Sequence, residues 1–307
     1  MTKQAIIDIG SNSMRLSVYE TEGANFRILF KEKIMAGLAG YVEQGSLTDG
    51  GIRCAYEGLL AFREILDALG IEKTRVFATA SLRNVQNTDE AVAAIERATG
   101  YSVDVLSGEQ EADYGFLGAM QAVSVQRGAY VDIGGASTEV VTFHGGQAEA
   151  AISFGVGSLN LYKQCVKKII PGEKSQKRIE AAIEAHIDDK KLFPFDKRSA
   201  LVGVGGTARA VVKLAGKRLD LGDDCCRLTG SQFEDFCDFL LRGDQAAVSL
   251  ILKHEPERIH TIMPGTLILR HIFRLFRSEE LLVSKYGVRE GYLCQRQWNT
   301  PTPKTGS

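Results

Sequence analysis

The sequence predicts an α/β fold built from two similar halves, each with a mixed sheet flanked by helices. The chain has 307 residues, which is enough for two domains of about 150 residues each. Both halves begin with three consecutive strands and continue with alternating helices and strands, a pattern typical of this architecture. In addition, the segment Asp8–Tyr19 is matched by the segment Asp132–Phe143, 124 positions further along the chain.

The boundary between the halves is predicted at Gln126-Arg127-Gly128, just before the second copy of the repeat. This divides the chain into an N-terminal domain at 1–126 and a C-terminal domain at 127–299. The last residues, 300–307, consist mainly of Thr, Pro, Lys, Gly and Ser, so we expect a flexible tail there.

In the first half, the order of elements follows from apolar spacing and from the residues at helix ends. Apolar residues recur at helical spacing before Gly70: Leu59, Phe62, Leu66 and Leu69. The next helix has acids in its first turn and Gly100 after its end. The full prediction is strands at 4–10, 15–20 and 25–34, a helix at 48–69, a strand at 75–80, a helix at 88–99, a strand at 103–106 and a helix at 109–123.

The second half is predicted to repeat this opening and then to become mainly helical. Apolar Ala129-Tyr130-Val131 leads into the second copy of the repeat, and a third strand covers 148–154. Helices follow at 158–168 and 175–189, and Ala200–Val204 reads as a strand. The chain after this strand is expected to be mostly helix.

Each copy of the repeat reads as a strand, a tight turn and a second strand, with an aspartate at the mouth of the turn. Turns rich in Gly, Ser and Asn allow backbone N–H groups to converge on an anion. Two such hairpins therefore indicate two half-molecules that hold one polyanionic ligand between them. The alternative is that both are ordinary hairpins of a sheet.

The composition is that of an ordinary globular protein, with 44% apolar and 24% charged residues. No apolar run approaches the roughly 20 residues of a membrane span, and no nucleic-acid-binding motif is present. The six cysteines form no CxxC pair and no zinc-binding pattern, which favours reduced thiols and a cytoplasmic protein.

The net charge of −1 conceals an uneven distribution along the chain. Residues 1–126 hold 11 basic and 17 acidic residues, whereas 163–218 hold 14 basic and 6 acidic ones. Such a basic stretch would suit a wall along a long anion. A solvated helix surface explains it equally well.

Five segments, taken in order, resemble the exopolyphosphatase / guanosine pentaphosphate phosphohydrolase (Ppx/GppA) phosphatase family of the actin-like ATPase superfamily. They are Asp8-Ile-Gly-Ser-Asn-Ser-Met-Arg15, Ala78-Thr-Ala-Ser-Leu-Arg-Asn84, Leu106-Ser-Gly-Glu-Gln-Glu-Ala112, Asp132-Ile-Gly-Gly-Ala-Ser-Thr-Glu139 and Gly203-Val-Gly-Gly-Thr207. Pro264-Gly265 and Val283–Gly291 extend the resemblance to about residues 4–293. It implies two actin-like (ribonuclease H-like) domains with an interdomain cleft.

The resemblance implies that Glu111 is the catalytic base and that Glu139 helps to orient water or metal. A carboxylate in the first turn of a helix that faces a cleft can hold and deprotonate a water molecule. On pattern alone, Glu109 and Glu111 are acids that stabilise a helix N-terminus. Gln110 stands where the family usually has the first of two adjacent acids, and Ala136 where it more often has a third glycine.

A divalent cation, Mg²⁺ in the first instance, is expected between the carboxylates and the substrate phosphates. The family places metal and water around residues matching Asp132, Gly134 and Glu139, and Asp8 is the equivalent acid of the first turn. An aspartate at a strand end can instead cap a turn.

The predicted phosphate-binding groups are two arginines and the three Gly-rich loops. Arg15 occupies the repeat position that Glu139 holds in the other copy, and Arg83 resembles a second phosphate-facing arginine of the family; either could also be an exposed residue. The loop at Gly203 also fits the dinucleotide pattern GxGxxA, but no strand precedes the acids that follow it. The loop groups are Gly10, Ser11, Asn12, Ser13, Gly135, Ser137, Thr138, Gly205, Gly206 and Thr207.

The resemblance thus implies a phosphoanhydride hydrolase that removes the terminal phosphate of inorganic polyphosphate. The alternative substrate is guanosine pentaphosphate, and the basic 163–218 stretch favours polyphosphate. A kinase of the same superfamily is a further alternative. So is a nucleotide-binding sensor, which only Gln110 and Ala136 support. The expected partners are the substrate alone, without nucleic acid or membrane, and a homodimer is left open.

Overall fold

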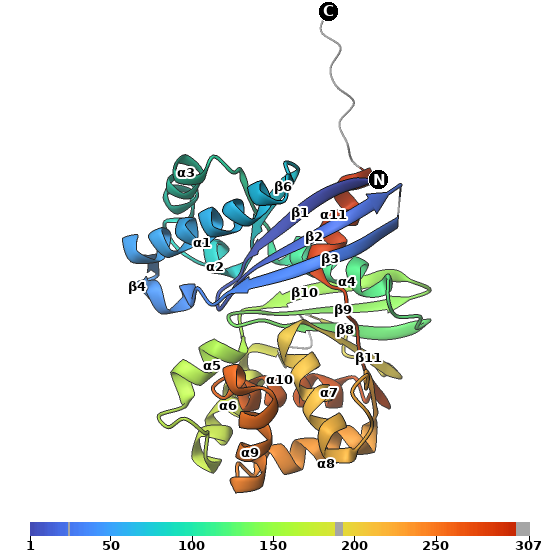
Figure 1. Cartoon of the computed structure of the whole chain (residues 1–307). Helices are drawn as coiled ribbons and strands as arrows, with labels where there is room; N and C mark the ends of the chain where they lie inside the picture. Colours follow the sequence, from blue (N-terminus) through green and yellow to red (C-terminus); the bar gives the residue numbers. More distant parts are fainter. Residues whose placement is uncertain (24, 188–192, 299–307) are drawn as a thin grey trace, which may run out of the picture.

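The structure, a computed structural model, describes residues 1–23, 25–187 and 193–298. These residues form two mixed sheets, which lie one above the other in Figure 1. The upper sheet has the order β3-β2-β1-β6-β7 and the lower one the order β10-β9-β8-β11-β13-β12. The predicted α/β fold with two mixed sheets is therefore confirmed.

The strands of the first sheet lie between residues 2 and 105, and those of the second between residues 127 and 283. The first sheet consists of β1 (Thr2–Ile9), β2 (Met14–Glu22), β3 (Asn25–Ile34), β6 (Thr74–Ala78) and β7 (Val103–Val105). The second consists of β8 (Arg127–Ile133), β9 (Thr138–His144), β10 (Gln147–Phe154), β11 (Ala200–Val204), β12 (Arg227–Thr229) and β13 (Glu280–Val283).

The two copies of the sequence repeat form the same hairpin. In the first, Ile9 is paired with Met14, and the turn is closed by the N–H of Gly10 donating to the carbonyl of Ser13 at 3.2 Å. In the second, Ile133 is paired with Thr138, and the corresponding bond from Gly134 to Ser137 measures 2.9 Å. The predicted strand–turn–strand arrangement is thus confirmed in both halves.

The helices of the first half cover the outer face of the first sheet. They are α1 (Asp49–Ala68), α2 (Ala80–Arg83) and α3 (Thr88–Thr99), and a short hairpin of β4 (Val42–Glu43) and β5 (Ser46–Leu47) follows the 3₁₀ helix η1 (Leu38–Tyr41). Of the apolar residues at helical spacing, Leu59, Phe62 and Leu66 are buried in the core. Leu69 is 52% exposed, because α1 ends before it.

The helices of the second half pack below the second sheet (Figure 1). They are α5 (Ser158–Cys165), α6 (Glu173–Ile187), α7 (Gly205–Leu219), α8 (Gly230–Leu241), α9 (Gln245–His254) and α10 (Ile262–Leu275), with the 3₁₀ helix η2 (Pro256–Arg258). The expectation of mainly helix after 204 missed β12 and β13. Both strands are short, and they owe their form to sheet pairing: β13 pairs with β11, and β12 pairs with β13. None of the described helices is long and apolar enough to cross a membrane.

Two helices, α4 (Gly108–Met120) and α11 (Val288–Trp298), lie between the sheets. Each of them packs against the sheet of the other half of the chain. Ala112 and Phe116 of α4 pack with Tyr130 of the second sheet, whereas Tyr292 of α11 packs with Phe77 of the first. The helices approach each other so closely that a Cβ on Gly291 would lie 1.8 Å from a backbone oxygen of α4. The division into domains 1–126 and 127–299 stays a prediction, and the tail at 300–307 lies outside the described residues.

Candidate active site

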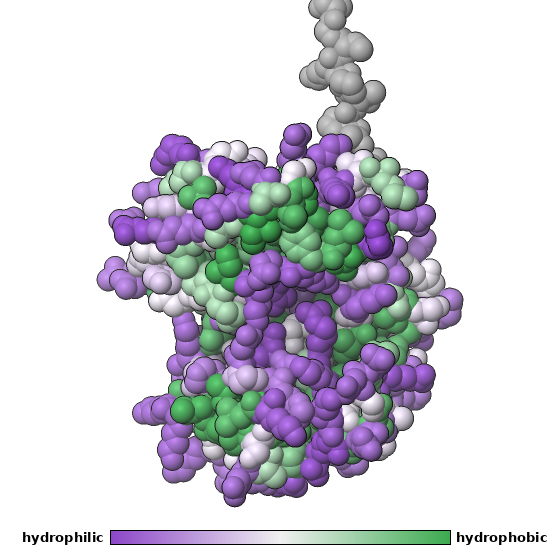
Figure 2. Space-filling model, viewed as in Figure 1, coloured by the Kyte–Doolittle hydropathy of each residue, from purple (hydrophilic) through white to green (hydrophobic). Residues whose placement is uncertain are grey.

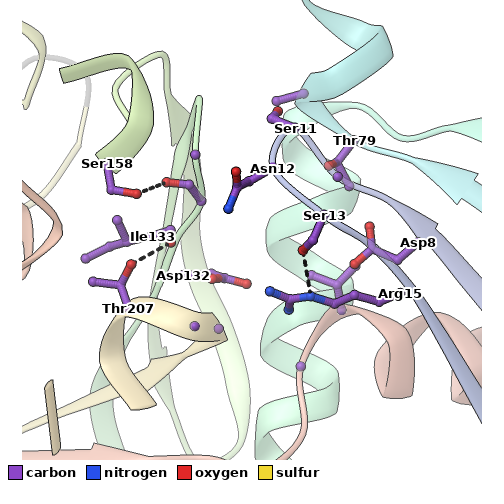
Figure 3. A pocket seen from close by; sticks show the side chains of 18 of the residues that line it. Asp8, Ser11, Asn12, Ser13, Arg15, Thr79, Asp132, Ile133, Ser158 and Thr207 are labelled. Carbon is purple, nitrogen blue, oxygen red and sulfur yellow. Dashed lines mark hydrogen bonds between the residues drawn. The ribbon is translucent and has the colours of Figure 1, made fainter. Parts of the chain in front are cut away.

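The two hairpin turns face each other across a cavity between the halves of the molecule. Figure 3 shows Asp8, Ser13 and Arg15 on one side and Asp132 and Thr207 on the other. In the space-filling view a hydrophilic band crosses the molecule at this level, between apolar regions above and below it (Figure 2). The cavity is therefore a polar site built by both halves of the chain.

In both hairpins, the carbonyl groups of the turn accept hydrogen bonds from neighbouring backbone. The carbonyls of Ser11 and Asn12 accept from the N–H groups of Ala39 and Gly37, and those of Gly134 and Gly135 accept from the first turn of α5. No hydrogen bond links the N–H groups of Ser11, Asn12, Ser13, Gly135, Ala136 or Ser137 to a described residue. These free N–H groups suit an anion.

The third predicted loop adds the N-terminus of α7 to this site. Gly205, Gly206 and Thr207 line the cavity, and no side chain caps the helix. Gly205 has φ +73°, and a Cβ there would lie 2.1 Å from Oδ1 of Asp132, so only glycine allows this close approach. Uncapped N–H groups at a helix N-terminus bind phosphate oxygens well.

Several basic side chains that sequence reasoning did not assign also reach the cavity. Besides Arg15, the described lining includes Lys33, Arg209, Arg258, Lys285 and Arg289. Burial and the neighbouring guanidinium groups of Arg15 and Arg289 lower the pKa of Arg209 to about 10. The like charges of Arg15, Arg209 and Arg289 disfavour one another, and a bound anion would offset this repulsion, so these arginines suit a multiply charged ligand.

The acids of the site are buried, and their pKa values are displaced accordingly. Burial raises the pKa of Glu111 to about 7, and the guanidinium of Arg83 opposes this shift. Burial, Glu111 and Asp132 together raise the pKa of Glu139 well above its ordinary value. Burial also raises the pKa of Asp8 and Asp132, against the effect of nearby arginines. A glutamate with a pKa near 7 is suited to accept a proton from water.

Two predicted phosphate-binding residues do not line the cavity. Arg83 lies beside it and contacts Glu111, with a distance of 2.7 Å between Nη1 and Oε2. Thr138 is fully buried, and its hydroxyl donates to the carbonyl of Val156 at 2.6 Å. The other predicted site residues, including Asp8, Asp132, Glu111 and Glu139, are brought together at the cavity.

The structure also assigns a local role to Gln110, the departure from the family pattern. Its side chain accepts from the N–H of Ser107 at 3.0 Å, and its own N–H donates to the hydroxyl of Ser107 at 3.1 Å. These reciprocal bonds form a capping box at the start of α4. Because a glutamine fulfils this role as well as a glutamate does, its presence leaves Glu111 in position.

The basic stretch 163–218 contributes little to the wall of the cavity. Arg209 is its one charged residue among the described lining residues. Nζ of Lys163 donates instead to the carbonyl of Ala39 at 2.6 Å, which links the two halves at an exposed position. The idea of a basic channel along this stretch stays a prediction.

The carboxylates fit a divalent cation only in part. No group of three or more acidic, histidine or cysteine side chains in the described part of the chain is arranged to hold a metal ion. Asp8 and Asp132 approach from opposite sides of the cavity (Figure 3). Glu139 accepts from the hydroxyl of Ser153 at 2.7 Å. Mg²⁺ is commonly bound by one or two carboxylates together with substrate phosphates and water, and Asp132 fits such a role.

Comparison with known proteins agrees with this geometry. A model described as the Ppx/GppA phosphatase family matches residues 17–298. The crystal structure of the Aquifex aeolicus member of the Ppx/GppA protein family has a TM-score of 0.79 and 26% sequence identity, and the match covers 97% of this chain and 99% of that one.

Curated relatives carry two kinds of name. A Vibrio vulnificus guanosine-5'-triphosphate,3'-diphosphate pyrophosphatase is 28% identical over 94% of this chain and 58% of its own length. A Haemophilus influenzae protein, provisionally named an exopolyphosphatase, is 25% identical over 96% of this chain and 91% of its own length. The chain spans about half the length of the first curated relatives that it matches.

Proposed function

Because the chain belongs to the Ppx/GppA phosphatase family, we propose that it removes the terminal phosphate of inorganic polyphosphate and releases inorganic phosphate. The observation that carries the proposal is a buried glutamate, Glu111, beside two facing anion-binding turns and a cluster of arginines. The turns and arginines suit a chain of phosphates, and the pKa of Glu111, about 7, suits a general base.

In the proposed reaction the terminal phosphate enters between the two turns. Their free N–H groups and the N-terminus of α7 bind its oxygens, while Arg15 offsets its charge from the first half. Glu111 accepts a proton from a water molecule, whose oxygen attacks phosphorus in line with the anhydride bond. That bond breaks, the shortened chain leaves with the bridging oxygen, and the attacked phosphate is released.

We also propose that a divalent cation takes part, with Asp132 as its protein ligand. Such a cation would neutralise charge that builds up on the phosphoryl oxygens. Asp132 is supported by its position at the mouth of the second turn, next to the start of α7. Asp8 and Glu139, predicted as further ligands, would contribute through water or not at all.

Guanosine pentaphosphate is the second candidate substrate, because a relative is named for it. Both substrates end in a row of phosphates, and they differ in what lies beyond it: further phosphates in polyphosphate and a guanosine in guanosine pentaphosphate. A panel assay of phosphate release from polyphosphate, guanosine pentaphosphate and ATP, each with and without Mg²⁺, distinguishes them. Turnover of guanosine pentaphosphate without turnover of any polyphosphate would favour the second candidate, and no release from any substrate would reject hydrolysis.

A cytoplasmic location belongs to the same proposal. All six cysteines are free in the described part of the chain. Free thiols are the usual state in a reducing compartment. Labelling the native and the denatured protein with a thiol reagent after isolation from cells would test this, and disulfide-linked cysteines would contradict it.

A further inference from the structure

Arg83 is held between two buried carboxylates that come from different halves of the chain. It ends the short helix α2, and its Nη1 donates to the carbonyl of Leu106 at 3.0 Å and to Oε2 of Glu111 at 2.7 Å. Its Nη2 lies 4.0 Å from Oε1 of Glu139. The guanidinium therefore faces two acids and a backbone carbonyl beside the cavity.

Neighbouring contacts fix the elements that carry these three side chains. The hydroxyl of Ser81 donates to the carbonyl of Ile9, which ties α2 to the end of β1. On the other side, Ser153 holds Glu139, and a Cβ on Gly108 would lie 2.6 Å from the Cβ of Ser153. The first turn of α4 is thus pressed against β10, which sets the distance between Glu111 and Glu139.

At this position the positive charge of the guanidinium can offset the repulsion between the two carboxylates. Two carboxylates buried side by side repel each other, and each pays for the loss of water. A planar guanidinium with several donors can contact both acids at once and fix their orientation. A lysine in its place would offer a point charge to one acid at a time.

We propose that Arg83 is a positioning residue that holds the general base Glu111 beside Glu139, and not a ligand of the substrate phosphates. The proposal rests on the proposed hydrolase function. It differs from what the family resemblance implies, namely a phosphate-facing arginine. The two roles predict opposite effects on substrate binding and on turnover.

The test compares Arg83→Met and Arg83→Lys with the wild-type protein in steady-state hydrolysis of tripolyphosphate. Loss of the guanidinium should lower kcat roughly 100-fold, since small displacements of a catalytic group have effects of this size. KM should stay within about threefold, as expected when no ground-state contact is lost. Arg83→Lys should recover part of kcat. Arg97→Met, at an exposed position of α3, is the matched control and should leave both constants unchanged.

A binding measurement decides between the two roles without turnover. Glu111→Gln and the double variant Glu111→Gln/Arg83→Met are titrated with tripolyphosphate by calorimetry. Equal affinities support the positioning role, whereas binding weakened about tenfold or more, the size of a lost charge-assisted contact, would make Arg83 a phosphate ligand. Thermal unfolding of each variant shows whether it folds, and Arg83→Lys serves if Arg83→Met does not.

The outcomes also separate this proposal from the proposed function. If Glu111→Gln keeps wild-type turnover, the assignment of the base is wrong and the positioning role falls with it. If Glu111→Gln is inactive but Arg83→Met changes only KM, the hydrolase assignment stands and Arg83 binds phosphate. If both single variants lose kcat and the double variant is no slower than Glu111→Gln, the two residues act as one unit.

Discussion

The two hairpins have the same register and the same turn bond, and they carry opposite charges at one position of the repeat, Arg15 in the first and Glu139 in the second. In the first, Asp8 is the cross-strand partner of Arg15; in the second, Asp132 is the partner of Glu139. Both turns are closed by the same bond, and both have their carbonyls held by the segment that follows the hairpin. The backbone therefore offers the same anion-binding groups twice, while the side chain opposite the aspartate sets the role of each half.

From this difference we expect the first hairpin to bind the substrate and the second to assist the chemistry. Arg15 adds a positive charge at the cavity beside Arg289, which together with burial lowers the pKa of Arg15. Glu139 is 1% exposed and lies next to Arg83 and Glu111. A duplicated fold can thus divide binding and catalysis between its halves by a single exchange of charge.

The largest effect is expected at Glu111, which belongs to the first half but lies with the acid of the second hairpin. Glu111→Gln should lower kcat by about 10²–10⁴, because the amide keeps the shape but cannot accept the proton. Phosphate release from tripolyphosphate measures this. Glu109→Gln, an exposed acid in the same helical turn, is the control and should stay active. More than roughly a tenth of wild-type turnover in Glu111→Gln would exclude it as the base.

The two aspartates test whether the cation belongs to one hairpin. In the presence of Mg²⁺, Asp132→Asn should lower kcat/KM roughly 100-fold through the loss of charge stabilisation. Asp8→Asn should have a smaller effect, because its position is equivalent but lies on the binding side. Excess EDTA should remove the activity of the wild-type protein. Full turnover in EDTA would reject the cation, and equal losses in both variants would place it between the hairpins.

Arg15 and Glu139 test the division of roles directly. Arg15→Gln should raise KM about 10- to 100-fold, as expected for a lost charge-assisted contact. Glu139→Gln should instead lower kcat and leave KM nearly unchanged. Full kinetics on one substrate for both variants separate the two constants. Similar changes in KM for both would mean that the hairpins do not differ in role.

The pH profile should report the ionisation of Glu111, the acid of the first half that lies beside Glu139 of the second. The pKa of Glu111 is raised to about 7, and a general base acts only in its ionised form. Activity should therefore rise as pH increases through 7 and fall about tenfold for each unit below it. The residual activity of Glu111→Gln should lack this limb. Constant wild-type activity between pH 5 and pH 7, as for an unperturbed glutamate with a pKa of about 4.3, would contradict the assignment.

The smallest effect is expected outside the cavity. Charge reversal of Lys163, Lys167 and Lys168 should raise KM only a few-fold for long polyphosphate, by analogy with the salt-sensitive binding of other linear polyanions. It should leave kcat unchanged, and tripolyphosphate serves as the short control substrate. Equal changes in KM for long and short chains would reject a basic channel along 163–218.

Much of this architecture is readable in the chain itself. The repeated Asp8 and Asp132 segments predict both hairpins, because alternation of apolar residues and Gly-rich turns are local signals. Gly205 is predicted at the site because it belongs to a Gly-rich motif at the start of a helix, whereas Glu111 is predicted there only through the resemblance to the Ppx/GppA family. The strands β12 and β13 were missed, because three- and four-residue strands owe their form to pairing with distant neighbours.

What the tertiary structure alone decides is which side chains meet. Arg209, Arg258 and Arg289 lie on α7, η2 and α11, and no spacing in the sequence connects them. Thr138 and Glu139 are adjacent in the chain, yet successive side chains of a strand point to opposite faces, so they contact different neighbours. Local patterns specify turns and helix ends, because they depend on neighbouring residues. A site assembled from both halves depends on packing between them, which no short segment encodes.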